Sequence, residues 1–258
     1  MTEELFREDA QRDECAARVT AIDELGVRLD RTVFYPQGGG QAGDAGLLRL
    51  ADGRELRVAD TRKGALPGQI VHVLADARDA AVLPPGTDVT AVIDRSRRAA
   101  HMRFHTATHL LCALVPHPVD GCSITAAYAR LDFHMNEPLD KQLLSAGIAR
   151  LVAEAHPVRH RWISEAELDA NPQLVRSMSP PGRPKGEFRS AQHEGTPVSV
   201  QPPRGQGRIR ILEIEGVDLQ PCGGTHVANT AEIGAVVVTK VEKKSAMTRR
   251  VVLGFAQS

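Results

Sequence analysis

The stretch Arg103-Phe-His-Thr-Ala-Thr-His-Leu-Leu111 places two histidines in an apolar run that suits a helix. His105 and His109 are four residues apart, just over one helical turn, so both imidazoles project from the same face. Far downstream, Pro221-Cys-Gly-Gly-Thr-His-Val227 offers Cys222 and His226 at the same spacing. Together the four side chains form the mixture of nitrogen and sulfur ligands that zinc takes in tetrahedral coordination.

Neither pair is decisive alone, because a lone histidine on a helix is usually packed or exposed. Both pairs together, one on a helix and one across a Gly-Gly turn, favour one zinc site per chain. His101 and Cys112 lie near enough in sequence to compete as ligands, but roles as neighbours or core residues are commoner. Four protein ligands would by default make the zinc structural. No HExxH, GxSxG or P-loop motif names a reaction.

The bulk composition is that of an ordinary globular protein. Of 258 residues, 42% are hydrophobic and 25% are charged, which suggests one or two domains with a real core. The apolar runs are too short to span a membrane, and residues 1–13 are acidic and polar, so we expect a cytoplasmic protein. The four cysteines form no CxxC pair, which favours free thiols or a metal ligand over disulfides.

Residues 1–93 form the first predicted domain, a small antiparallel β-barrel. Alternating apolar and polar positions and regular turn signals predict about six short strands, at residues 16–22, 26–34, 47–50, 55–58, 69–74 and 87–93. A loop in this half, Phe34-Tyr-Pro-Gln-Gly-Gly-Gly-Gln-Ala-Gly-Asp-Ala-Gly46, has five glycines in thirteen residues. Glycine lets another molecule approach the backbone closely, although a plain flexible turn is the simpler reading of such a run.

Residues 94–258 form the second predicted domain, which is α+β. Asp94 is the expected N-cap of a helix over 94–115, which ends before Pro116. A second helix is predicted over 140–155, with Leu143 and Leu144 on its apolar face. Further predicted elements are strands at 121–124, 127–133, 158–163, 208–214, 234–242 and 249–255, a short helix at 165–170, an irregular excursion at 178–207 and a turn at 222–226.

The formal charge is unevenly spread over the chain. Residues 1–93 carry 11 Lys and Arg against 16 Asp and Glu, whereas residues 94–258 carry 21 against 16. Seven of the basic residues fall between Arg176 and Arg210. Such a stripe is either a solvated face or a phosphate-binding surface, and charge alone does not decide between them.

The motifs together resemble those of the free-standing alanyl-tRNA editing proteins of the AlaX type and of the editing domain of alanyl-tRNA synthetase. The resemblance covers nearly the whole chain and rests on the two ligand motifs, the Gly-rich loop and further segments: Arg130-Leu-Asp-Phe133, Pro202-Pro-Arg-Gly205, Val217-Asp-Leu-Gln-Pro-Cys222 and Asn229-Thr-Ala-Glu-Ile-Gly234. Ala42 departs from the family, which often has proline after GGGQ. The length matches the medium form, without an aminoacylation domain.

The resemblance implies a β-barrel followed by an editing domain shared with threonyl- and alanyl-tRNA synthetases. It implies zinc-dependent hydrolysis of the ester of mischarged Ser-tRNA(Ala), with Gly-tRNA(Ala) as a second candidate, and maps His105, His109, Cys222 and His226 onto the zinc ligands. We expect catalytic or selective roles for Thr106 and Ser123. Substrate contacts are expected from Gly38, Gly39, Gly40, Gln41, Arg204, Arg249 and Arg250.

The expected partner is the acceptor end of tRNA(Ala), held through phosphates by the basic stripe, and not DNA or a membrane. We expect a monomer or weak dimer. One alternative is a non-catalytic tRNA-binding module whose zinc only holds the fold. The other is an editing domain of the threonyl type, which the CGGTH turn and the GGGQ loop disfavour.

Overall fold

The structure, a computed structural model, describes residues 1–174 and 207–256. Two compact units make up the chain, Met1–His101 and Met102–Ser258, and the division falls inside helix α1 (Arg95–Leu114). The predicted boundary before residue 94 lies at the start of this helix and stays a prediction. The irregular excursion predicted at 178–207 falls almost wholly outside the described residues. No helix in the described ranges is long and apolar enough to cross a membrane.

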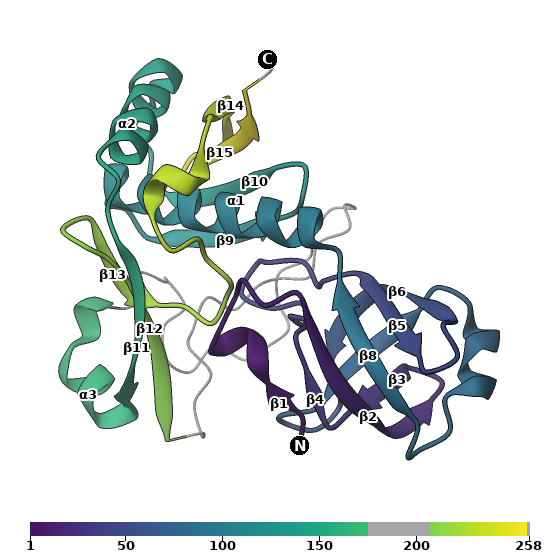
Figure 1. The fold of residues 1–258 in the computed structure, drawn as a ribbon. Helices are drawn as coiled ribbons and strands as arrows, with labels where there is room; N and C mark the ends of the chain where they lie inside the picture. Colours follow the sequence, from purple (N-terminus) through teal and green to yellow (C-terminus); the bar gives the residue numbers. More distant parts are fainter. Residues whose placement is uncertain (175–206, 257–258) are drawn as a thin grey trace. The chain divides into compact units, whose positions relative to one another are not determined.

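The first unit contains a closed barrel whose neighbouring strands pair antiparallel, in the order β2-β3-β7-β6-β5-β8. The predicted small antiparallel β-barrel is therefore confirmed (Figure 1). Alternate side chains fill its core, among them Val19, Val27 and Leu48, which are at most 1% exposed. The barrel strands are β2 (Glu14–Asp23), β3 (Gly26–Leu29), β5 (Gly46–Leu50), β6 (Glu55–Lys63), β7 (Ile70–Leu74) and β8 (Asp88–Ile93).

The single strand predicted over residues 26–34 is wrong, because the chain changes partner at Asp30. The Asp30 carboxylate accepts hydrogen bonds from the backbone N–H groups of Arg18 and Arg31, at 2.7 and 2.8 Å. Beyond it, β4 (Arg31–Thr32) pairs in parallel with β1 (Glu3–Glu4) instead of continuing the barrel. The remaining elements of this unit are two 3-10 helices, η1 (Leu5–Arg7) and η2 (Ala77–Val82).

The described residues of the second unit form two antiparallel sheets and two longer helices. One sheet has the strand order β14-β15-β10-β9, and the other has the order β11-β12-β13. Phe104 of α1 packs on Phe255 of the first sheet, with ring centroids 4.2 Å apart. The strands are β9 (Val119–Ile124), β10 (Ala129–His134), β11 (Val158–Ser164), β12 (Arg208–Ile214), β13 (Asp218–Pro221), β14 (Val236–Ser245) and β15 (Thr248–Phe255).

Polar caps begin the helices where the sequence predicts them. The Asp94 carboxylate accepts a hydrogen bond from the Arg97 N–H at 3.0 Å, and Asp140 caps α2 (Lys141–Ala153) in the same way. The predicted place of Leu143 on the apolar face of α2 is wrong, because its side chain is 72% exposed. Leu144, Ile148 and Leu151 form the buried stripe. The part of this unit that the structure describes also contains the short helices α3 (Glu165–Ala170), η3 (Pro172–Leu174) and η4 (Thr230–Ile233).

Candidate metal centre

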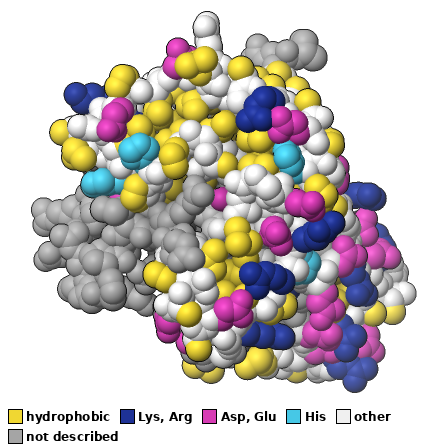
Figure 2. Space-filling view, turned by 90° about the vertical axis from the view of Figure 1, so that its left-hand side faces the viewer, with side chains coloured by type: hydrophobic (Ala, Val, Ile, Leu, Met, Phe, Trp, Pro, Cys, Tyr) yellow, Lys and Arg dark blue, Asp and Glu magenta, His cyan; other side chains and the backbone are white. Residues whose placement is uncertain are grey.

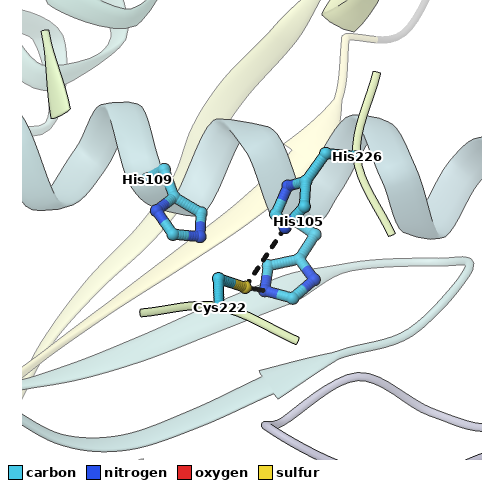
Figure 3. Close-up of side chains that lie close together, drawn as sticks. All are labelled: His105, His109, Cys222 and His226. Carbon is cyan, nitrogen blue, oxygen red and sulfur yellow. Dashed lines mark hydrogen bonds between the residues drawn. The ribbon is translucent and has the colours of Figure 1, made fainter. Parts of the chain in front are cut away.

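Four side chains of the second unit converge on one point (Figure 3). His105 and His109 come from α1, Cys222 follows strand β13, and His226 follows the Gly-Gly turn. Their potential ligand atoms all lie within 4.8 Å of one another. The Cys222 Sγ is 3.4 Å from the His105 Nε2 and 3.2 Å from the His226 Nε2. The three histidines are buried and the cysteine is half-buried. The two pairs, far apart in the sequence, thus lie together in the fold.

A buried arginine holds the turn that carries the two downstream ligands. The Arg210 Nη1 donates hydrogen bonds to the carbonyl oxygens of Cys222 and Gly224, at 3.2 and 2.8 Å. The Cys222 N–H donates to the Arg210 carbonyl at 3.0 Å, which extends the pairing of β12 with β13. The sequence counted Arg210 as part of a basic stripe. The structure shows it 6% exposed, with its guanidinium serving the ligand turn.

The hydroxyl of Thr106 fixes the ring of His226. It donates to the Met102 carbonyl at 2.9 Å, so its oxygen acts as an acceptor toward its other two partners. These are the Val227 N–H at 3.3 Å and the His226 Nδ1 at 3.2 Å. The His226 Nδ1 must therefore carry the proton, which leaves the Nε2 lone pair for a metal. The Thr108 hydroxyl bonds back to the His105 carbonyl at 2.6 Å.

His109 has a carboxylate partner that the sequence reading missed. The Asp218 Oδ2 lies 2.8 Å from the His109 Nδ1 and accepts a second hydrogen bond from the Gln220 Nε2 at 2.6 Å. The Asp218 side chain is 0% exposed. Strand alternation could have given a signal, because Asp218, Gln220 and Cys222 follow one another at every second residue.

The charges within the cluster suit a divalent metal. Burial raises the pKa of the Cys222 thiol, but the charges of His105 and His226 and hydrogen bonds from His105 and His109 outweigh it and hold the pKa well below its usual value. Burial lowers the pKa of His109, yet its hydrogen bonds to Asp218 and Cys222 raise it to about 9. One thiol and three imidazoles, which release their protons when a metal binds, are a donor set that fits tetrahedral zinc.

Ser123 lies next to the buried Cys122 on strand β9 and is itself partly exposed. Burial raises the pKa of the neighbouring Cys122 thiol, which is 9% exposed. Ser123 projects from the opposite face of β9, where it pairs in register with Arg130. This placement gives no support to a catalytic role for Ser123, which stays a prediction.

The glycine-rich loop is an ordered turn of the first unit. Gly38 and Gln41 exchange two backbone hydrogen bonds of 3.0 Å, and Gly39 and Gly40 between them have φ angles of +57° and +88°. Two consecutive positive φ angles define a tight hairpin turn that favours glycine. The tip at Gly39 is exposed, whereas the side chain of Gln41 is fully buried. The predicted substrate contacts of this loop stay predictions.

The three predicted arginine contacts have different surroundings. Arg249 is 8% exposed. Its guanidinium donates to carbonyl oxygens of the β14–β15 hairpin and, at 3.1 Å, to that of Glu137 between β10 and α2, which favours a structural role. Arg250 is half-buried and forms a bidentate pair with Asp132 at 2.7 and 2.8 Å. Arg204 lies outside the described residues. Figure 2 shows basic and acidic side chains interspersed on its visible face, with no continuous basic field among the coloured atoms.

Two family models match parts of the chain, and both describe domains of tRNA synthetases. A family model described as the Threonyl and Alanyl tRNA synthetase second additional domain matches residues 209–252, and that of tRNA synthetases class II (A) matches residues 5–97. The protein is thus of the class related to tRNA synthetases.

Full-length relatives narrow this class. The chain is 34% identical to the alanyl-tRNA editing protein AlaX-M of Methanosarcina barkeri and 33% identical to that of Methanosarcina acetivorans, in each case over 97% of both chains. It belongs to the family of AlaX-M alanyl-tRNA editing proteins. It is also 31% identical to the alanine–tRNA ligase of Pyrococcus furiosus, of which it covers 26%.

Proposed function

We propose that this protein is an aminoacyl-tRNA hydrolase that removes serine from mischarged Ser-tRNA(Ala), with Gly-tRNA(Ala) as a second substrate. The observation that carries the proposal is the buried cluster of His105, His109, Cys222 and His226, whose ligand atoms lie within 4.8 Å of one another. Its two ligand pairs lie in a chain that aligns from end to end with AlaX-M editing proteins. Zinc is the metal that its nitrogen and sulfur donors fit.

Hydrolysis of an aminoacyl ester needs a positioned water and stabilisation of the developing oxyanion. A zinc ion held by these four residues would supply Lewis-acid character and a fixed positive charge at the ester or the amino group. The protein's own groups keep the site rigid: Thr106 fixes the tautomer of His226, and Arg210 fixes the turn with Cys222. Burial of the imidazoles limits the number of competing waters near the reacting ester.

A hydrolase of this kind must spare Ala-tRNA(Ala). The site that charges tRNA with alanine can discriminate against one small extra group by only about 1–3 kcal/mol, so it cannot reject serine completely. A second selection step, at a separate hydrolytic site, is therefore needed. We expect the sieve to recognise serine by its hydroxyl, which alanine and glycine both lack, so Gly-tRNA(Ala) should be the slower of the two substrates. The sequence predicts a selective role for Thr106, but hydrogen bonds to Met102, Val227 and His226 already occupy its hydroxyl. We therefore propose that Thr106 orients the imidazole of His226 for the metal.

For the tRNA acceptor end we propose contacts with the basic side chains of the β14–β15 hairpin. Lys243 and Lys244 are exposed at the end of β14 and suit phosphate oxygens. Arg250 shares its charge with Asp132, so its contribution would be smaller. Phosphate contacts of this kind predict binding that weakens steeply with salt.

One observation favours a second candidate function. Four protein ligands fill a tetrahedral zinc shell, which is typical of structural sites. The alternative is therefore a tRNA-binding module whose zinc stabilises the fold without turnover.

The deciding experiment measures deacylation of Ser-tRNA(Ala), Gly-tRNA(Ala) and Ala-tRNA(Ala), each with and without a zinc chelator. We expect chelator-sensitive loss of serine with alanine spared. Cys222→Ala should abolish the reaction, and Cys15→Ala, which removes a buried thiol from the core of the barrel, is the matched control. Binding of all three tRNAs without ester loss would replace the hydrolase with the structural-zinc module.

A further inference from the structure

Strand β13 brings three polar side chains to the metal centre at alternate positions. Asp218 and Gln220 lie on the strand, and Cys222 continues it by pairing with Arg210. Residues at i, i+2 and i+4 of a strand project from one face. The element that supplies the thiolate ligand therefore also supplies the groups that touch the other nitrogen of His109.

The contacts converge on one carboxylate oxygen. The Asp218 Oδ2 lies 2.8 Å from the His109 Nδ1 and 2.6 Å from the Gln220 Nε2. The Gln220 Nε2 is also 2.9 Å from the His109 Nδ1. Because an ionised carboxylate oxygen only accepts, the His109 Nδ1 carries its proton toward Asp218, and the Gln220 amide donates to the same oxygen. The amide of Gln220 thus fixes the carboxylate, and the carboxylate fixes the imidazole.

The two orienting contacts of the cluster differ in strength. His226 is held by the neutral hydroxyl of Thr106 at 3.2 Å, whereas His109 is held by a carboxylate at 2.8 Å. A hydrogen bond to an ionised acceptor is shorter and roughly twice as strong as one between neutral groups. A carboxylate on Nδ1 also raises the basicity of the ring, which makes Nε2 a better metal ligand.

Charge balance points the same way. A divalent zinc with one thiolate and three neutral imidazoles keeps one uncompensated positive charge. The Asp218 side chain, 0% exposed, places one negative charge directly behind His109. Burying a compensated group of charges costs much less than burying a net charge.

We propose that Asp218, held by Gln220, is a positioning residue that fixes His109 and sets the metal affinity of the centre. The inference rests on the proposed zinc site but not on the proposed hydrolysis. It predicts that loss of the carboxylate weakens metal binding while all four ligands remain. The Asp-x-Gln-x-Cys pattern of residues 218–222 would then supply one metal ligand, Cys222, and orient a second, His109.

The test measures Zn²⁺ affinity by competition with a chromophoric chelator, using the full chain. Asp218→Asn should bind Zn²⁺ about 10- to 100-fold more weakly than the unaltered protein. Asp120→Asn is the matched control, because Asp120 also meets a histidine Nδ1, that of His134 at 3.1 Å, outside the cluster. It should leave the affinity unchanged.

The second readout is the absorption spectrum of the protein loaded with Co²⁺. A loss of general stability would not alter the ligand field at saturation, whereas a reoriented His109 should shift the d–d bands and keep the thiolate charge-transfer band of Cys222. An Asp218→Asn protein with unchanged affinity and spectrum would overturn the proposal. If that variant does not fold, Gln220→Met decides: weaker binding supports the proposal, and binding equal to the Asp120→Asn control overturns it. Failure of the unaltered protein to bind either metal would instead remove the proposed zinc site.

Discussion

Two buried polar clusters include residues of helix α1, and they are built on opposite principles. In the first unit, Asp44 and Arg98 form an ion pair whose side chains are 1% and 3% exposed. The carboxylate also accepts the Tyr35 N–H at 2.7 Å, and the guanidinium donates to the carbonyls of Val33 and Ala10. Opposite charges and matched donors satisfy one another, so this cluster needs no ligand.

In the second unit, three histidines and one cysteine, each of which can offer a lone pair to a metal, converge on one point. The rings of His105 and His226 have centroids 4.3 Å apart, and those of His109 and His226 are 5.0 Å apart. Two of the rings are held from behind, by Thr106 and Asp218, with their remaining nitrogens toward the centre. Buried polar groups that complement one another indicate stability, whereas buried groups of one kind that converge indicate a site for a cation.

The largest expected effect breaks the first cluster. Arg98→Met would leave the Asp44 carboxylate buried without its counter-charge, and loss of one partner of a buried pair costs roughly 3–5 kcal/mol of unfolding free energy. Urea unfolding measures this, with Arg95→Met as the control, because Arg95 is 78% exposed. The folded Arg98→Met protein should still bind zinc with full stoichiometry. Unchanged stability would show that the pair is not a structural requirement.

Removal of metal should act on the second cluster alone. With free Zn²⁺ at about 100 times its dissociation constant, the folded protein gains about 2.7 kcal/mol over the apo protein. A chelator should abolish this increment, and so should Cys222→Ala. Arg98→Met should keep the increment on its lower baseline. Thermal unfolding with and without chelator measures it, and an equal increment in Cys222→Ala would place the metal elsewhere.

A third buried group, His72, is satisfied by protein groups as the Asp44–Arg98 pair is, and its contribution to stability depends on pH. Its nitrogens meet the Thr32 hydroxyl at 2.8 Å and the Val27 carbonyl at 3.1 Å, so it is satisfied by protein alone. Burial lowers its pKa from 6.5 to about 4. The unfolded chain then takes up the proton first, so stability from the neutral ring is present above pH 6.5 and is lost as pH falls toward 4.

At pH 5 the loss from His72 should be about 2 kcal/mol. The measurement compares unfolding free energies of the unaltered protein and His72→Gln between pH 7.5 and pH 5. The difference between the two proteins should change by this amount, with His72→Gln the less sensitive to acid. Two parallel curves would mean that protonation of His72 does not oppose folding.

The sequence predicted best what depends on local spacing. Four residues on a helix and four across a Gly-Gly turn are enough to orient His105, His109, Cys222 and His226, and the barrel follows from short alternating strands. Partners brought together by tertiary folding were missed: Asp218 is 109 residues from His109, and no local rule joins them. The number of basic residues in the sequence likewise does not show that Arg210 is buried and bound to backbone carbonyls, instead of exposed and able to bind phosphate.

Leu143 shows a second limit of sequence patterns. Leu143 and Leu144 are adjacent, so on a helix they point about 100° apart and only one can face the core directly. Because both are leucines, hydrophobicity alone does not decide which of the two is buried. The buried stripe of Leu144, Ile148 and Leu151 is fixed by the packing of α2 on the sheet, where the Ser145 hydroxyl accepts a hydrogen bond from the Val238 N–H.

The smallest expected effect separates two roles for Thr106. Thr106→Val keeps the shape of the side chain but removes the oxygen that accepts from the His226 Nδ1 and the Val227 N–H. Zinc affinity should fall by about tenfold, the lower end for loss of an orienting contact, because this one is neutral and 3.2 Å long. Thr106→Ser keeps the hydroxyl and should restore the affinity.

The predicted selective role of Thr106 gives the opposite pattern. If its hydroxyl tests the substrate, Thr106→Val would bind zinc normally and lose the preference for Ser-tRNA(Ala) over Ala-tRNA(Ala). Zinc competition and the ratio of the two deacylation rates, measured on the same three proteins, distinguish the roles. Suppose that Thr106→Val alone binds zinc more weakly and that, with zinc saturating, the ratio of the Ser-tRNA(Ala) and Ala-tRNA(Ala) deacylation rates is unchanged. Thr106 would then be a residue that orients the metal ligand His226. The selective group would then have to be sought among residues whose hydrogen-bonding capacity the fold has not already used.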